Sequence, residues 1–184
     1  MLETERLLMR VPEPGDLDGY AAVFGDPEVV RFLGTGRQTR DKSAAAIERM
    51  LRHWERHGIG LFSVVRKSDD RLLGRAGFLL WDPRRWVHAM REELDAPFET
   101  EIGWTLGSAF WNQGYATEAA LACRDWALGE RGLTRLVSVI APENAASIRV
   151  AEKIGETLER EDLPGPFNRR VDLYSLGLGN GPAR

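Results

Sequence analysis

The chain has 184 residues, 43% hydrophobic and 29% charged, which predicts one globular domain over residues 1–184 with a sizeable core. The net charge of −3 gives no electrostatic reason to expect nucleic acid as a partner, and no apolar run is long enough to cross a membrane. A single cysteine excludes an internal disulfide and favours a reducing compartment. Because the charged N-terminus also lacks the apolar core of a signal peptide, we expect a cytoplasmic protein.

The first half of the chain predicts a strand, three helices and a β-hairpin, at residues 6–11, 17–24, 28–33, 39–58 and 61–81. Asp16 is expected to cap the first helix, Thr39 or Asp41 to start the long third one, and Gly58 to end it. Gly74 and Gly77 lie in the second strand of the hairpin, where glycine permits a bulge or close packing.

Two histidines of the long helix, His53 and His57, are four residues apart, a spacing that can hold a metal. The zinc-protease pattern requires Glu where Trp54 stands, and three arginines share the polar side, at positions 49, 52 and 56. Because these cations would repel a metal ion, we expect a solvated basic face and no metal site.

Residues 101–119 read as a strand, a tight polar loop and a helix. Ile102, Trp104 and Leu106 alternate with polar or small residues, and the helix starts near Ala116. Its apolar face includes Cys123, which is therefore expected in the core rather than as a nucleophile.

The loop before this helix has two interpretations. Unpaired amides at a helix N-terminus, together with a glycine that lets the backbone approach a ligand, make a socket for phosphate; here that glycine is Gly114. An ordinary strand-to-helix turn is the alternative. The Walker and dinucleotide-binding fingerprints both fail, because the required lysine and additional glycines are missing.

The last part of the chain predicts strands at residues 134–141, 158–161 and 171–176, and a helix at residues 144–154. Asn144 is the expected N-cap of the helix, and Gly155 closes it. Residues 164–168 are expected as a loop and residues 177–184 as a tail.

The run from Trp111 to Ala119 resembles the acetyl-CoA loop of the GNAT acetyltransferases, most closely the branch containing the ribosomal-protein alanine acetyltransferases. That loop reads Gln/Arg-x-x-Gly-x-Gly/Ala; Gly114 and Ala116 match it, whereas Trp111 replaces the usual Gln or Arg. Residues 144–155 closely match a second GNAT motif, and the resemblance covers residues 4–176 apart from an insertion at 82–98. It implies an α/β fold with a mixed, twisted sheet that is splayed in the middle and flanked by helices.

The resemblance also implies residue roles in binding acetyl-CoA. Main-chain groups of Thr105 and Leu106 would pair with the pantetheine arm. The thioester would lie near Asn144 and Ser147. The pyrophosphate would be held by the amides of Asn112, Gln113, Gly114, Tyr115, Ala116 and Thr117.

The implied reaction moves an acetyl group from acetyl-CoA to a primary amine, either a protein N-terminus or a small molecule. Glu101 is the candidate base, with a structural strand carboxylate as the alternative. Ser147 is the candidate acid, because the tyrosine that many members carry further along this helix is missing. A GNAT-like module that binds acyl-CoA without catalysis, and a nucleotide-binding domain of another fold, are the rival functions.

Two acceptor-side features remain open. The insertion at 82–98 is either a lid over the acceptor pocket, an elaborated surface loop or a contact in a homodimer. The acidic cluster of Glu92, Glu93, Asp95, Glu99 and Glu101 either attracts a cationic amine or is a solvated loop.

Overall fold

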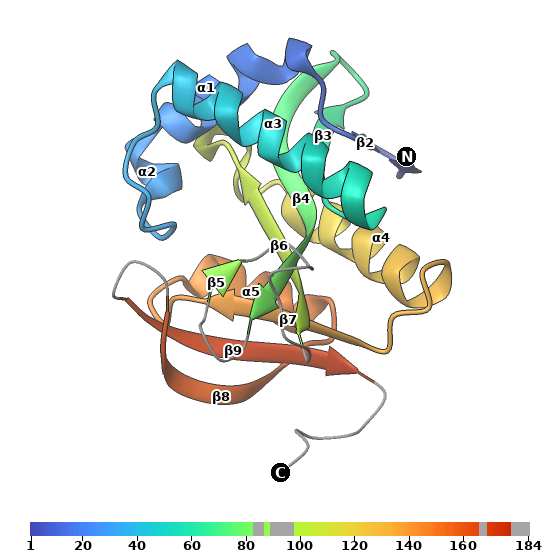
Figure 1. Ribbon diagram of the computed structural model, residues 1–184, viewed down its shortest axis with the longest axis vertical. Coiled ribbons are helices and arrows are strands. Elements are labelled where there is room, and N and C mark those ends of the chain that lie inside the picture. Colours follow the sequence, from blue (N-terminus) through green and yellow to red (C-terminus); the bar gives the residue numbers. More distant parts are fainter. Residues whose placement is uncertain (83–86, 89–97, 166–168, 178–184) are drawn as a thin grey trace.

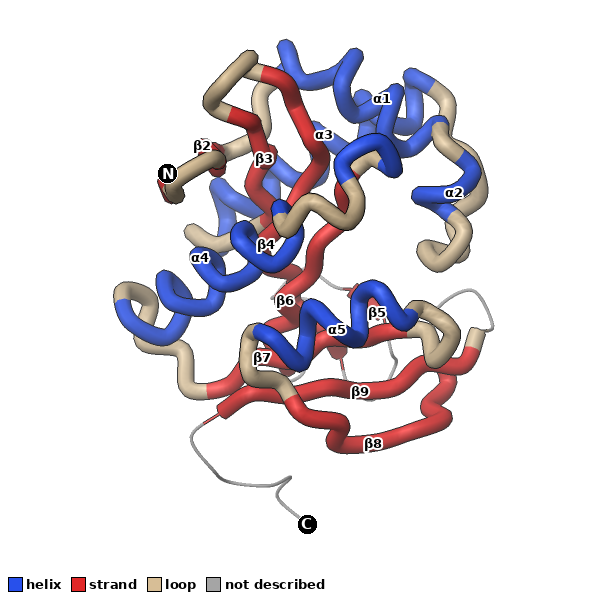
Figure 2. Tube along the Cα trace, turned by 180° about the vertical axis from the view of Figure 1, so that it is seen from behind, coloured by secondary structure: helices blue, strands red, loops and turns tan. Residues whose placement is uncertain are grey.

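The computed structural model describes residues 1–82, 87–88, 98–165 and 169–177, which form an open sheet with helices on both faces (Figures 1 and 2). The strands are β1 Leu2–Glu3, β2 Leu7–Arg10, β3 Leu61–Arg66, β4 Arg71–Asp82, β5 Val87–His88, β6 Glu99–Leu106, β7 Arg135–Ile140, β8 Thr157–Pro164 and β9 Arg170–Gly177. The helices are α1 Leu17–Gly25, α2 Pro27–Val30, α3 Arg40–His57, α4 Tyr115–Gly129 and α5 Ala145–Lys153.

The sheet is splayed between β6 and β7. Its order is β1-β2-β3-β4-β6-β7-β9-β8, with β5 beside β4. β4 and β6 pair along their length, from Trp81 opposite Glu99 to Gly74 opposite Leu106, whereas the parallel pairing of β6 with β7 is recorded at Glu101 and Val137. The expected mixed, splayed sheet is therefore confirmed.

Different helices cover the two faces of the sheet. α1 and α3 lie over β3 and β4 in Figure 1, whereas α4 and α5 lie in front in the reversed view of Figure 2. Phe24 of α1 and Met50 of α3 share one core cluster, and such a side chain stabilises the fold by about 1.5–3 kcal/mol when fully buried. On α4 the buried residues other than Tyr115 are small, and Ala119, Ala120 and Cys123 are fully buried beneath the helix.

Several local expectations are confirmed. The side chain of Thr39 accepts a hydrogen bond from the Lys42 amide at the start of α3, and Gly58 ends that helix in the left-handed conformation. Gly74 and Gly77 have φ of 150° and 137°, and the pairing of β3 with β4 shifts register beside Gly74.

Within the described ranges, no helix is long and apolar enough to cross a membrane.

Three expectations are wrong. The Asp16 side chain does not cap α1, because its carboxylate instead accepts hydrogen bonds from Arg10, at 2.9 and 2.6 Å, and from the Ser63 hydroxyl, at 2.6 Å. His53 is only 6% exposed and so does not lie on a solvated face. Pro164 belongs to β8, where it pairs with Arg170, rather than to a loop.

Most of the expected insertion and the tail beyond Gly177 lie outside the described residues, so the interpretations of both remain predictions. Glu92, Glu93 and Asp95 of the acidic cluster lie outside them as well. Of the rest of the cluster, Glu99 is paired with the Arg135 guanidinium at 3.0 Å, so it is neutralised locally rather than presented to an acceptor.

Candidate functional site

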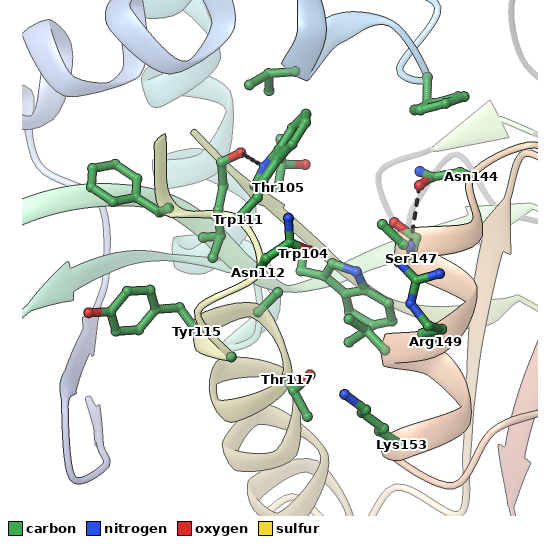
Figure 3. A pocket seen from close by; sticks show the side chains of 18 of the residues that line it. Trp104, Thr105, Trp111, Asn112, Tyr115, Thr117, Asn144, Ser147, Arg149 and Lys153 are labelled. Carbon is green, nitrogen blue, oxygen red and sulfur yellow. Dashed lines mark hydrogen bonds between the residues drawn. The ribbon is translucent and has the colours of Figure 1, made fainter. Parts of the chain in front are cut away.

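A pocket of about 540 Å³ opens where β6 leaves β7, between the loop leading to α4 and the first turns of α5 (Figure 3). Nine of the ten residues expected to bind acetyl-CoA line it: Thr105, Leu106, Asn112, Gly114, Tyr115, Ala116, Thr117, Asn144 and Ser147. Gln113 does not line it, since its side-chain amide donates to the Ala109 carbonyl oxygen at 2.9 Å. The pocket therefore brings together two motifs that are about thirty residues apart.

The N-terminus of α4 forms one wall of this pocket. Gly114 is its N-cap, with φ of 83°, and no side chain caps the first turn. Asn112 also has positive φ, at 59°, so the loop turns sharply before the helix begins at Tyr115. Uncapped first-turn amides at the positive end of a fifteen-residue helix favour an anion in this position.

An ion pair fixes the loop to the N-terminal segment. Glu118, in the first turn of α4, accepts hydrogen bonds from the Thr4 hydroxyl at 2.5 Å and from the Arg6 side chain at 2.7 Å. Arg6 also donates to the Gln113 carbonyl oxygen at 3.0 Å and stacks over the Tyr115 ring. Burial alone would raise the pKa of Glu118, but these bonds outweigh it and hold the pKa below its usual value.

The free edge of β6 forms the second wall. The Gly107 amide bonds to the Leu73 carbonyl oxygen, and the alternation of an antiparallel pair then directs the main chain of Thr105 toward Arg75 of β4. The main chains of Trp104 and Leu106 instead face the splay. For pairing with an extended ligand, the register therefore favours Trp104 and Leu106 over Thr105, although the Leu106 carbonyl oxygen already accepts the Trp111 indole N–H at 2.8 Å.

Helix α5 forms the third wall. The Asn144 side-chain oxygen accepts from the Ser147 amide at 3.2 Å, as expected of an N-cap, which leaves the Asn144 NH₂ group able to donate into the pocket. Arg149 and Lys153 also line the pocket, on the same side of α5 in Figure 3. Sequence reasoning missed both cations, although their spacing of four residues was the available signal. No carboxylate is among the described residues that line the pocket.

The two candidate catalytic residues lie differently. Ser147 lines the pocket. The side chain of Tyr115, at the start of α4, points away from Ser147 in Figure 3. Glu101 is not among the lining residues; it lies on β6 opposite Leu79, on the sheet face covered by α1 and α3. Burial raises the pKa of the Cys123 thiol, which agrees with a core residue rather than a nucleophile.

Comparison with known proteins agrees with this geometry. Residues 6–157 match the model of the acetyltransferase (GNAT) domain family. Over 158 residues the chain is 32% identical to the uncharacterized protein YkkB of Bacillus subtilis, covering 84% of this chain and 83% of YkkB. It is 27% identical over 182 residues to the uncharacterized N-acetyltransferase p20 of Bacillus licheniformis, covering 96% and 94% of the two chains.

Two solved structures have the same fold. A GNAT-family acetyltransferase from Bacillus anthracis is 26% identical with a TM-score of 0.75, and the match covers 96% of this chain and 97% of that one. The ribosomal alpha-N-protein acetyltransferase RimL, in complex with coenzyme A, is 14% identical with a TM-score of 0.73, covering 95% and 96%. The family match, the similar relatives and the splayed sheet lead to one conclusion: the chain belongs to the GNAT family of acetyltransferases.

Proposed function

We propose that this chain, as one catalytic domain, transfers an acetyl group from acetyl-CoA to a primary amine by direct attack. The observation that carries the proposal is the pocket itself, in which uncapped α4 amides face two cations of α5. Its volume of about 540 Å³ lies within the usual range for small-molecule sites. RimL, which has this fold, was solved with coenzyme A, which supports the choice of donor.

In this proposal the amides from Asn112 to Thr117 hold the pyrophosphate, and Arg149 and Lys153 neutralise phosphate charge. The free edge of β6 pairs with the pantetheine arm and places the thioester beside Asn144 and Ser147. The Asn144 NH₂ group is then the donor to the oxyanion that develops on the thioester carbonyl.

Glu101 accepts a proton from the ammonium form of the acceptor, directly or through water, and later releases it to solvent. The neutral nitrogen attacks the thioester carbon, so that an N–C bond forms and the C–S bond breaks. The second proton of the nitrogen passes through the Ser147 hydroxyl to the departing sulfur, which leaves as the free thiol of CoA. The reaction then yields the N-acetyl product and one proton.

Thiol release from acetyl-CoA, measured over a panel of primary amines, tests the proposal. Acetylation of at least one amine, with loss of turnover in Glu101→Gln but unchanged acetyl-CoA binding, is expected. Tight acetyl-CoA binding without thiol release for any amine would instead favour the non-catalytic acyl-CoA-binding module. A cytoplasmic site of action is part of the proposal, since the single cysteine is a free thiol.

A further inference from the structure

A cation lies on the sheet face that carries the candidate base. β4 and β6 pair so that Arg75 is opposite Thr105, Gly77 opposite Gly103 and Leu79 opposite Glu101. Alternation along a strand puts Arg75, Thr105 and Glu101 on one face, the face covered by α1 and α3 (Figure 1). Thr105 lines the pocket, so this face is continuous with the proposed acetyl-CoA site.

No carboxylate of the described residues lies within ion-pair distance of Arg75, although Glu101 acts on its charge from further away. Its guanidinium stacks on the Phe24 ring, 4.7 Å from the centroid. The side chain is largely buried, which lowers its pKa, and its charge is attracted by Glu101 and repelled by Arg49 of α3. A largely buried guanidinium without a bonded anion is costly unless a ligand supplies one.

The sheet is open between this cation and the candidate base. Two glycines face each other there, Gly77 and Gly103, so neither β4 nor β6 places a side chain between Arg75 and Glu101. Among the described residues, a Cβ placed on Gly103 would meet the Glu101 Oε1 alone, at 4.0 Å, whereas a Cβ on Gly77 would meet the Gly60 carbonyl oxygen at 2.4 Å. The open space therefore lies over Gly103, on the sheet face that carries both the Glu101 carboxylate and the Arg75 guanidinium.

We propose that Arg75 binds an anionic group of the acceptor while Glu101 receives the proton of its amine, so the substrate is a small amine carrying a carboxylate or a phosphate. The proposal rests on the acetyl transfer proposed above and narrows its acceptor. It excludes a protein N-terminus as the acceptor, because the α-carboxyl group of the first residue is part of a neutral peptide bond. The guanidinium suits both anions because its planar donors match either one.

Paired acceptors test the proposal: leucine against leucinamide, and phosphoethanolamine against ethanolamine, each with saturating acetyl-CoA. The wild type should favour the anionic member of at least one pair by about ten- to a hundredfold in kcat/KM, the range for a hydrogen bond to a charged group. Arg75→Met should abolish that preference and leave the KM for acetyl-CoA unchanged. Arg52→Met is the matched control, because this exposed arginine lies on α3, where it pairs with Glu48.

A second variant changes the room available to the acceptor and leaves the charges unchanged. Gly103→Ala should fold normally, since its Cβ enters open space, yet it should raise the acceptor KM because the methyl group narrows the gap. Equal kcat/KM for both members of each pair in the wild type, or an equal loss for both in Arg75→Met, would overturn the proposal.

Product binding separates this proposal from the acetyl transfer itself. If no amine is acetylated, calorimetry with N-acetyl-leucine and N-acetyl-leucinamide in the presence of CoA still reports on Arg75. Binding of the anion alone, lost in Arg75→Met, would support the anion site and reject the proposed reaction. Binding of neither compound, or of both equally, would reject the anion site.

Discussion

Replacing one buried carboxyl group should change how stability depends on pH. Glu156, between α5 and β8, is 2% exposed, and neither of its carboxyl oxygens has a hydrogen-bond partner among the described residues. Burial raises its pKa to about 8, and the nearby Glu101 charge adds to the increase. Ser138 lies close enough to oppose this shift, but its hydroxyl donates to the Ile102 carbonyl oxygen.

The raised pKa of Glu156 determines whether the unfolding free energy rises or falls with pH. Below pH 4.5, the ordinary pKa of a glutamate, Glu156 is protonated in both the folded and unfolded states, so its ionisation does not change the unfolding free energy. Between pH 4.5 and about 8 the unfolded state loses its proton first, which lowers the unfolding free energy by about 1.4 kcal/mol per pH unit. Glu156→Gln should therefore be more stable than the wild type by about 3 kcal/mol at pH 7, and the gain should vanish near pH 4.5.

Urea unfolding between pH 4.5 and 8.5 measures this difference. Glu130→Gln, at an exposed position after α4, is the matched control and should show no such trend. A constant difference between Glu156→Gln and the wild type across the range, or a difference that grows toward low pH, would show that Glu156 is not a buried, uncompensated acid.

Three further variants test other features of the structure. Lys153→Met should raise the KM for acetyl-CoA about fivefold, as for a partly exposed ion pair, but not that for acetyl-pantetheine, which lacks the phosphates. Glu118→Gln should lower the unfolding free energy by about 1–2 kcal/mol at pH 7. Because the pKa of Glu118 is lowered, this loss should shrink as acid titration protonates the wild-type carboxylate; a loss independent of pH would refute the ion-pair account. Gly74→Ala places a Cβ 2.2 Å from the Thr105 carbonyl oxygen and should cost about 2–4 kcal/mol by thermal unfolding. Gly129→Ala, at the end of α4 with open space around it, should instead be neutral or stabilise by up to about 1 kcal/mol.

Local sequence was sufficient wherever one backbone segment contains the whole interaction. The Asn144 cap, the end of α3 at Gly58 and the apolar face of α4 around Cys123 were predicted correctly, and Thr39 was one of the two residues expected to start α3. Each depends on residues within one or two helical turns, so periodicity and capping chemistry specify it. The two GNAT motifs likewise lie within single segments.

Tertiary structure decided what depends on partners distant in the chain. Asp16 left its expected capping role because its carboxylate bonds to Ser63, 47 residues away, and to Arg10, which pairs with Ser63 on the neighbouring strand. Likewise, the alignment of β4 with β6 determines that Arg75 and Glu101 share a face across a pair of glycines. A shift of β6 by one residue against β4 would turn Glu101 to the sheet face opposite Arg75. Strand register depends on residues far apart in the chain, so no local pattern of residues specifies it.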